Sequence, residues 1–537
     1  MKKQLQKTIL IAVVAFFGLS NIANAQALFK DLYLGGPTSS SNPLRFTEVN
    51  GMMYFVTEQN PLTDYSGTQP HSYALWKSDG TVPNTIRVKD SIISTNAGDA
   101  LWLYNVNNTL FFVKFTTANI YQSTTTELWK SDGTEAGTTL IKTLLSVNTA
   151  PANFTVAGNK LFFQMDAGDG IELWVSDGTT AGTMQVIDLA PGLDPYYSAP
   201  ISGVVDAPMA AFNGKVYFSG TTVSQDNNGN SNLELYVSDG TSIGTTLVQD
   251  INPGIYSSLP KNWVIYNNEL YFLVQDSYIS GSTTTNIWKT DGTNTVAVTT
   301  NNIYHFNTPV VFKNAIYFIK GSTGSEALWK TDGTNAGTVS VTTSAAQING
   351  ANADYLITSS YGSNYKKTDG TTVTAVPDSL GKTASFKVLN NKMYYGDGAR
   401  GLWSTDGTEV GTTHLAPSSL NPNYLFVFDN NLFFSGFIAG TGIELCSLNP
   451  AITTGINQVN NLQGISVYPN PSTGIFTCIA PAMSEIKIYN VLGAVVYTGK
   501  ITSEKTEINL TQQPKGVYFY QLTGNEHAAK SGRIIIE

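Results

Sequence analysis

The stretch ELWVSDGTTAGT, from Glu172 to Thr183, recurs along this chain of 537 residues and decides its fold. Eight copies keep an Asp-Gly-Thr sequence, and their aspartates are Asp79, Asp132, Asp177, Asp239, Asp291, Asp332, Asp369 and Asp406. A ninth copy, IELCSLN at Ile443–Asn449, keeps the apolar segment but lacks the Asp-Gly-Thr turn. Repetition of one short unit at intervals of tens of residues predicts a repeat architecture.

Each repeat contains four short apolar segments separated by turn residues. In the copy around Asp177 they are Phe154–Ala157, Leu161–Met165, the ELWVS segment itself and Met184–Leu189. Most repeats join the first two segments by Asn-Gly or Asn-Asn, which tolerate the positive φ angles of a two-residue hairpin. The pattern predicts a four-stranded antiparallel sheet in each repeat. We interpret the repeated aspartates as structural, because an Asp in a turn can accept hydrogen bonds from nearby backbone N–H groups.

The tryptophans indicate how these sheets pack. Six of the eight occupy one motif position: Trp76, Trp129, Trp174, Trp288, Trp329 and Trp403. A packing residue recurs in this way, whereas a ligand-binding aromatic has no reason to, so we expect these rings to be buried between sheets. Phe162 and Phe163 are neighbours and point to opposite faces of their strand. Sheets that are apolar on both faces, stacked radially, form a β-propeller.

The two ends of the repeat region complement each other. Ala27–Gly36 reads like the fourth strand of a repeat, whereas the ninth copy supplies the first three strands and no fourth. We expect the N-terminal strand to complete the last sheet and close the ring. The predicted fold is therefore all-β, with a propeller of eight to nine four-stranded blades. The number is eight if the weak copy around Asp369 is not a full blade.

The N-terminus has the features of a secretory signal peptide over residues 1–25. Three lysines precede an apolar run, and Ala23-Asn24-Ala25 predicts cleavage between Ala25 and Gln26. The net charge of 30 − 39 = −9 would become 27 − 39 = −12 after cleavage. This balance argues against nucleic acid or an anionic membrane as a partner, and no second stretch is long and apolar enough to span a bilayer.

The remaining chain divides into three parts. The repeats extend over residues 26–449, and a polar, Gly- and Asn-containing segment over 450–464 is predicted to be a linker. Residues 465–537 alternate apolar and polar positions between turn signals, which predicts a small β-sandwich. With two cysteines, Cys446 and Cys478, a disulfide framework is excluded, although one bridge between them remains open.

Both regions resemble known families. The repeats resemble the ELWxxDGTxxGT repeat family of bacterial secreted proteins, whose fixed positions all occur in Glu127–Thr138 (ELWKSDGTEAGT). The last residues resemble a type A C-terminal sorting domain of the type IX secretion system, through Tyr468-Pro469-Asn470-Pro471, Leu492-Gly493, Lys515-Gly516-Val517-Tyr518 and the terminal Arg533–Glu537. The resemblance implies export across both membranes of a Gram-negative bacterium and interaction with the type IX translocon. It also implies release or attachment at the cell surface, and a propeller-like passenger with no settled activity.

We expect a ligand to bind on the face opposite the repeated turns. The connections that open there vary in length and composition, and variable loops on a rigid scaffold commonly carry binding sites. The leading hypothesis is a non-catalytic propeller that binds glycan or protein. The aromatic candidates for ligand stacking are Tyr65, Tyr73, Tyr196, Tyr197, Tyr256 and Tyr278.

Metal and catalytic sites have weaker signals. Asp226, Asn228 and Asn230 offer oxygens on alternate residues, as a calcium loop does, but the glycine of such a loop is missing and a solvated loop is the alternative. The four histidines have no Cys or His at ligand spacing, which argues against zinc. No other cofactor is expected. The alternative function is a polysaccharide-active hydrolase or lyase with carboxylates near the channel, although no acid pair is singled out.

Overall fold

The computed structural model describes the two predicted domains separately. Met1–Pro450 and Ala451–Glu537 form two compact units. The described residues are 27–32, 40–58, 71–94, 101–115, 124–147, 150–194, 198–223, 232–254, 256–279, 282–299, 303, 307–321, 324–342, 344–360, 365–376, 386–397, 401–448, 466–479, 484–490, 494–501, 503, 505–523 and 529–537. The predicted signal peptide and linker lie outside them.

The described part of the first unit forms nine four-stranded antiparallel sheets. The first four comprise β2 (Leu44–Val49), β3 (Met52–Glu58), β4 (His71–Ser78) and β5 (Ile86–Ser94); β6 (Leu101–Val106), β7 (Thr109–Phe115), β8 (Thr124–Ser131) and β9 (Thr139–Ser146); β10 (Ala152–Ala157), β11 (Lys160–Asp166), β12 (Ile171–Ser176) and β13 (Met184–Ile187); and β14 (Ala210–Phe212), β15 (Lys215–Gly220), β16 (Glu234–Ser238) and β17 (Thr246–Gln249).

Four more sheets continue the same order. They comprise β18 (Lys261–Tyr266), β19 (Glu269–Ile279), β20 (Ser282–Thr290) and β21 (Thr295–Ala297); β22 (Asn307–Phe312), β23 (Ala315–Lys320), β24 (Ala327–Thr331) and β25 (Val339–Thr342); β26 (Gln347–Ala351), β27 (Leu356–Ser359), β28 (Tyr365–Thr368) and β29 (Val373–Ala375); and β30 (Lys387–Leu389), β31 (Lys392–Asp397), β32 (Gly401–Thr405) and β33 (Thr413–Ala416). The weak copy around Asp369 is thus a full sheet, β26 to β29.

The ninth sheet joins the two ends of the unit. It contains β34 (Asn423–Phe428), β35 (Asn431–Ile438) and β36 (Gly442–Leu448), and β36 pairs with β1 (Ala27–Lys30). The antiparallel register places Leu28 opposite Cys446. A short 3₁₀ helix, η1 (Ser418–Leu420), precedes the sheet. The expectation that the N-terminal strand completes the last blade is confirmed.

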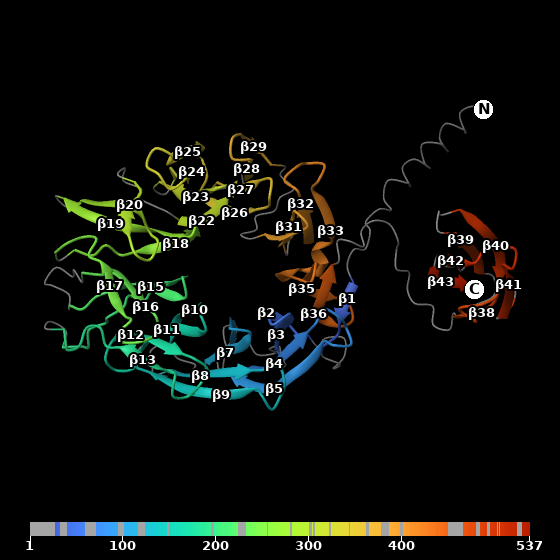
Figure 1. Ribbon diagram of the computed structural model, residues 1–537, viewed down its shortest axis with the longest axis horizontal. Helices are drawn as coiled ribbons and strands as arrows, with labels where there is room; N and C mark the ends of the chain where they lie inside the picture. The colour runs from blue at the N-terminus through green and yellow to red at the C-terminus, as the bar shows by residue number, and fades with distance from the viewer. Residues whose placement is uncertain are drawn as a thin grey trace, which may run out of the picture. The chain divides into compact units, whose positions relative to one another are not determined.

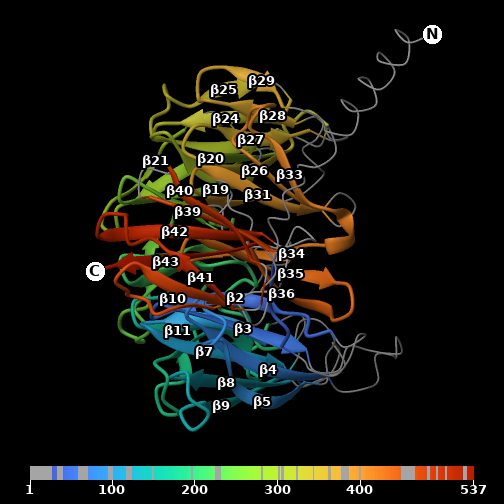
Figure 2. The same ribbon diagram turned by 90° about the vertical axis from the view of Figure 1, so that its right-hand side faces the viewer.

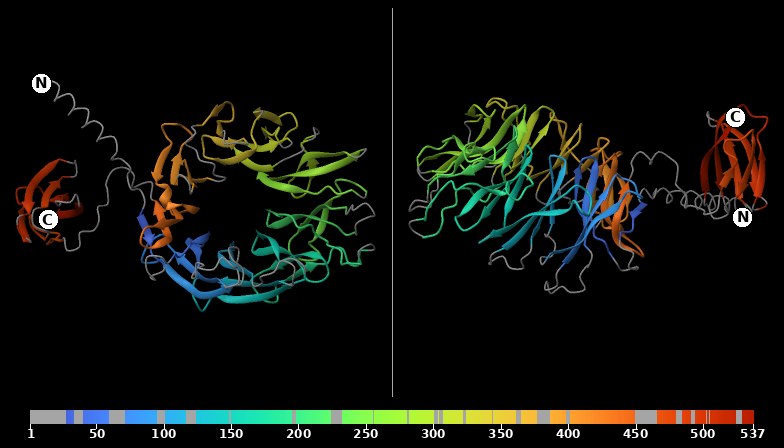
Figure 3. Two further views of the ribbon diagram at one scale, coloured as in Figure 1. Left: turned by 180° about the vertical axis from the view of Figure 1, so that it is seen from behind. Right: turned by 60° about the horizontal axis from the view of Figure 1, so that its bottom comes forward.

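The nine sheets follow one another around a ring (Figure 1). Figure 1 shows the first strand on the inner side and the fourth on the outer side, as for β2 and β5, β10 and β13, and β26 and β29, and Figure 3 shows the same ring from behind. Nine clusters of buried apolar side chains in the described residues each join two neighbouring sheets, and one of them joins the ninth sheet to the first. The unit is therefore a closed β-propeller.

The second strand of each sheet supplies much of this packing. On β11, Phe162 belongs to the cluster shared with the following sheet, whereas Phe163 belongs to the cluster shared with the preceding one, and both are fully buried. Such alternation is what a sheet with neighbours on both faces requires. At the seam, which is the contact between the ninth sheet and the first, Phe46 of β2 stacks on Phe426 of β34 with ring centroids 5.8 Å apart.

The strand directions define two faces of the propeller. The turns between strands one and two and between strands three and four lie at one end of each sheet, here named the turn face. The connections between strands two and three, and those that lead to the next sheet, lie at the other end, here named the loop face. The strands of the first sheet, β2 to β5, run alongside one another between the two faces (Figure 2).

The second unit is a sandwich of two antiparallel sheets. One contains β37 (Ser466–Tyr468), β38 (Ile475–Ile479) and β41 (Lys505–Asn509). The other contains β40 (Val495–Ile501), β39 (Ser484–Tyr489), β42 (Gly516–Thr523) and β43 (Ala529–Ile536). A single apolar core, with Phe476, Ile488 and Leu522 fully buried, joins the two sheets. Cys446 and Cys478 lie in different units and are both free thiols.

Candidate functional site

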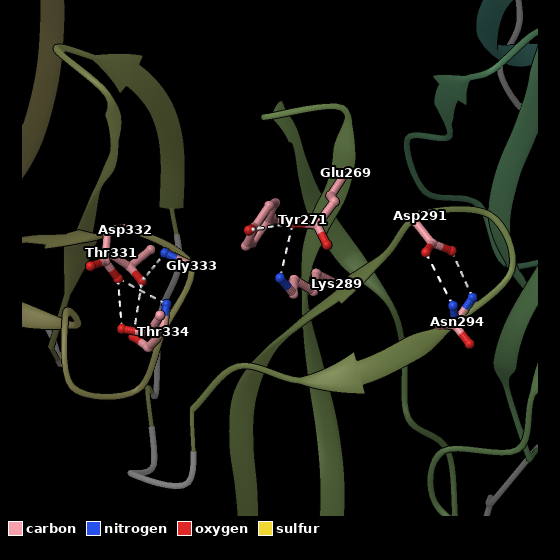
Figure 4. Close-up of polar contacts among 9 residues, drawn as sticks. All are labelled: Glu269, Tyr271, Lys289, Asp291, Asn294, Thr331, Asp332, Gly333 and Thr334. Carbon is pink, nitrogen blue, oxygen red and sulfur yellow. Dashed lines mark hydrogen bonds and ion pairs between the residues drawn. The ribbon is translucent and has the colours of Figure 1, made fainter.

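The Asp-Gly-Thr turns use their carboxylates to hold the backbone. The Oδ1 atom of Asp177 accepts hydrogen bonds from the N–H (2.9 Å) and the hydroxyl (2.8 Å) of Thr179. These hydrogen bonds lower the pKa of Asp177 below its ordinary value, because they stabilise the ionised form. Figure 4 shows the same arrangement at Asp332 with Thr334, and a variant in which Asn294 bonds to Asp291. The described contacts therefore give these aspartates a structural role in the turn.

The glycine of each turn is a contact point for the preceding sheet. Gly178 has φ of +86°, and a Cβ atom placed on it would lie 2.8 Å from Cζ of Phe111 in the sheet before it. Each of the other seven turn glycines also has an aromatic side chain of the preceding sheet within 4 Å of such a Cβ position, through a ring atom or a tyrosine hydroxyl. At the seam, Phe428 of the ninth sheet faces Gly80 of the first. The turn therefore sets the distance between neighbouring blades as well as reversing the chain.

Lysines add polar contacts between blades on the turn face. Lys130, which follows Trp129, donates a hydrogen bond to the carbonyl of Gly178 in the next sheet at 2.9 Å. Lys330 donates to the carbonyl of Gly370 in the same manner, also at 2.9 Å. On the turn face the Asp-Gly-Thr turn thus recurs, and lysines of the second and sixth sheets each add a contact to the turn of the next blade.

The motif tryptophans pack on aromatic rings of the adjacent strand. Trp76 stacks on Phe55, Trp129 on Phe112 and Trp174 on Phe163, with centroid separations of 6.3, 5.8 and 6.1 Å. Trp76 is buried and the other five motif tryptophans are half-buried, so the expectation of buried rings is confirmed for Trp76 only. A cation also reaches the ring in some sheets, as where Nζ of Lys320 lies 4.1 Å from the centroid of Trp329.

The six candidate tyrosines differ in where they lie and in how exposed they are. Tyr73 lies in β4 and is 2% exposed, within the cluster between the first two sheets, so its ring has no open face for a ligand. Tyr256 lies on the segment between β17 and β18 and is half-buried. Tyr278 belongs to the long hairpin of β19 and β20. Tyr65, Tyr196 and Tyr197, and the side chain of Tyr278, lie outside what the structure describes.

The candidate calcium loop, with Asp226, Asn228 and Asn230, also lies outside the described residues. Elsewhere, the described part of the chain contains no group of three or more His, Cys, Asp or Glu side chains placed to hold a metal ion. Among the same residues, no helix has the length and apolarity needed to cross a bilayer.

Three buried glutamates form contacts that sequence reasoning missed. Glu172 accepts hydrogen bonds from the N–H of Leu189 (3.1 Å), just beyond the outer strand, and from the N–H of Gly203 (2.6 Å), on the way to the next sheet. Glu234 bonds in the same way to Ile251 and Ser258 at 2.8 and 3.0 Å. Each carboxylate therefore ties the end of one blade to the chain entering the next. The signal in the sequence was the Glu that begins several ELW motifs.

The third glutamate, Glu444, makes this tie across the seam. It accepts hydrogen bonds from the N–H of Leu32 (3.1 Å) and the hydroxyl of Ser41 (2.7 Å), more than 400 residues away in the chain. Burial raises the pKa of Glu444 to about 7 and that of Glu172 to about 8. Both side chains are fully buried, and the same geometry recurs in three sheets. Because these glutamates are inaccessible to a substrate and recur in several sheets, we interpret them as structural ties rather than as general acids of a hydrolase.

The loop-face ends of the innermost strands differ from sheet to sheet. Arg45 of β2, Asn153 of β10, Asn262 of β18 and Tyr424 of β34 occupy one corresponding position at a β-bulge, and all have left-handed φ angles between 53° and 58°. Bulges of this kind re-aim a side chain. Asn153 donates to Asp206 at 2.7 Å, whereas Arg45 lies over the ring of Trp102 on β6. The same backbone shape therefore presents Arg, Asn or Tyr in these four blades.

In the second unit, two sequence motifs that lie far apart form one structure. The side-chain amide of Asn470 donates to the carbonyl of Arg533 at 2.7 Å and accepts from the N–H of Ile535 at 2.9 Å. The N–H of Glu537 donates to the carbonyl of Ser472 at 2.9 Å. The Pro-Asn-Pro turn thus holds the last strand of the chain at its C-terminal end.

The fold defines this chain as a β-propeller followed by a small β-sandwich. Residues 466–537 match the family described as the secretion system C-terminal sorting domain, and this match implies export of the chain by the type IX secretion system. No curated protein sequence matches the chain.

Solved structures with similar folds share little sequence with it. PorZ, a surface component of the type IX secretion system of Porphyromonas gingivalis, is 14% identical with a TM-score of 0.32, over 93% of this chain and 80% of that one. The β-propeller domain of the Trilobed protease from Pyrococcus furiosus is 10% identical with a TM-score of 0.34, over 62% and 95%. Citrobacter koseri AztD is 14% identical with a TM-score of 0.33, over 64% and 91%.

Proposed function

We propose that this chain is a non-catalytic secreted or cell-surface β-propeller that binds a glycan or a protein through its loop face. The observation that carries the proposal is the contrast between the two faces. The turn face repeats the Asp-Gly-Thr turn in eight sheets, and the glycine of each turn lies against an aromatic side chain of the preceding blade. The loop face places different residues at equivalent positions, and a rigid ring with variable positions on one face is suited to recognition.

Further parts of this proposal concern processing and ligand contacts. Cleavage between Ala25 and Gln26 would leave a chain whose second residue already pairs in β1. Tyr65, Tyr196, Tyr197, Tyr256 and Tyr278 remain the proposed aromatic contacts, and Tyr73 is withdrawn because it is buried. A calcium ion would be held by the side-chain oxygens of Asp226, Asn228 and Asn230, in the segment between β15 and β16.

The test is a binding screen with residues 26–450, which form a compact unit, against glycans and secreted proteins. We expect at least one ligand whose binding weakens when the loop tyrosines are replaced by alanine. A replacement of Val410 by serine, on an exposed turn of the opposite face, serves as the matched control. A screen without any ligand, or binding that survives all the tyrosine substitutions, would contradict the proposal.

A further inference from the structure

Three innermost strands beside the ring seam carry a large side chain at the second residue of the strand, in a β-bulge on β2 and β34 and in regular pairing on β6. Tyr424, Arg45 and Trp102 each stand near the loop-face start of their strand, on β34, β2 and β6. These strands belong to three successive sheets, the ninth, first and second. The side-chain amide of Asn105 on β6 donates to the carbonyl of Glu48 on β2 at 3.0 Å. Because packed sheets lie about 10 Å apart, the three side chains follow one another along the inner rim.

Two of these residues have a left-handed backbone conformation although each carries a large side chain. Arg45 has φ of 58° and Tyr424 has φ of 53°, in the left-handed region. That region is unfavourable for a residue with a Cβ atom and is most easily occupied by glycine. Elsewhere in the described residues most left-handed positions are Gly or Asn, and the same bulge holds Asn153 in β10 and Asn262 in β18, whereas Arg and Tyr stand here. Strain of this kind accumulates where a side chain has a binding role.

Arg45 and Trp102 form a composite surface. The guanidinium carbon of Arg45 lies 3.7 Å from the centroid of the Trp102 ring, which holds the planar guanidinium flat on the indole. Trp102 remains 40% exposed and Tyr424 is 58% exposed. A guanidinium matches an oxyanion through paired N–H donors, and exposed aromatic faces suit the flat side of a sugar ring.

We propose that Tyr424, Arg45 and Trp102 bind a sugar residue that carries a carboxylate or a sulfate, within an otherwise neutral glycan. The inference rests on the proposed function, because it names a ligand class for the loop face. Arg45 supplies the anion contact, and the two aromatic rings supply stacking on either side of it. The net charge of −9 opposes a long polyanion, so a single acidic group among neutral sugars fits the chain better.

The test compares matched oligosaccharides by titration calorimetry on the exported chain. The probes are a xylo-oligosaccharide with and without a glucuronic acid branch, and a galacto-oligosaccharide with and without a sulfate. We expect at least one acidic form to bind about tenfold or more tightly than its neutral parent, and Arg45→Gln to abolish that preference. Tyr424→Ala should weaken both forms alike, whereas Trp102→Ala should weaken both and also reduce the preference, because the Trp102 ring holds the guanidinium of Arg45. The two acidic arms show whether carboxylate or sulfate is the group recognised.

Controls separate binding from folding. Arg87→Gln, at an exposed arginine of β5 that pairs with Asp90 at 3.0 Å, should leave binding unchanged. Arg45→Lys keeps the charge without the planar donor pair, so it should lose most of the preference with an unaltered unfolding midpoint. Equal binding of acidic and neutral forms, no binding of either acidic form, or full binding by Arg45→Gln would overturn the inference. If another ligand then binds the loop face independently of Arg45 and Trp102, the proposed function survives; if none does, both fail.

Discussion

Replacing Glu172 by glutamine tests whether the buried glutamates tie neighbouring blades together. Both carboxylate oxygens accept backbone N–H groups, at 2.6 and 3.1 Å. Glutamine has the same shape but only one acceptor, so one buried N–H loses its partner. That loss costs about 1–3 kcal/mol. At pH 5 we therefore expect Glu172→Gln to be less stable than the wild type by this amount.

The pH dependence gives the sharper test. Burial raises the pKa of Glu172 from 4.5 to about 8, so the folded state holds a proton that the unfolded state releases above pH 4.5. This contribution to stability is complete below pH 4.5 and is lost as the pH rises through 8. The loss is about 1.4 kcal/mol per pH unit, or about 3 kcal/mol between pH 5 and pH 7. Glutamine does not titrate, so the variant should equal or exceed the wild type in stability at pH 7 and above.

The measurement is denaturant unfolding followed by tryptophan fluorescence at several pH values, with unchanged m-values as a check on the comparison. Glu127→Gln is the matched control, because Glu127 occupies the same motif position but is half-buried and pairs with Lys114 at 3.0 Å. Its effect should stay within about 1 kcal/mol at each pH. A stability difference for Glu172→Gln that is constant, or that widens as the pH rises, would refute the reasoning.

Three further predictions concern the turns and the seam. Gly178→Ala should destabilise the propeller by about 2 kcal/mol or more, because the new methyl group clashes with Phe111 and the residue must also adopt a left-handed φ. Gly51→Ala has only the unfavourable φ and should cost about 1 kcal/mol. Equal denaturation midpoints for the two variants would contradict this. Leu28→Cys should form a disulfide with Cys446, because the two residues are paired across β1 and β36. Mass spectrometry would show the loss of free thiol, and two free thiols would contradict the pairing of β1 with β36. All eight turn aspartates have lowered pKa values, so their contribution is present above the ordinary value of 3.8 and is lost as the pH falls through the lowered ones. Acid unfolding monitored by circular dichroism should therefore shift to higher pH in Asp177→Asn, and an unshifted transition would exclude this role.

Much of the fold could be read from the sequence because it is encoded locally. The Asn-Gly and Asp-Gly-Thr turns reverse the chain through bonds within a few residues, as between Asp177 and Thr179. The alternation of Phe162 and Phe163 was enough to predict neighbours on both faces of a sheet. The missing fourth strand of the last repeat even identified β1 as its partner. The Pro-Asn-Pro motif likewise predicted the sorting domain.

Other features depend on contacts between sheets, and only the tertiary structure decided them. In the ring of nine sheets, the weak copy around Asp369 forms a full blade. Tyr73, which the sequence had suggested as a ligand contact, is buried between two blades. Glu444 reaches Leu32 across the seam, and Arg45 reaches Trp102 in the next blade. Short-range hydrogen bonds and strand alternation leave a periodic trace in the chain. Contacts between blades leave none, because the residues that meet are set by how the sheets close into a ring.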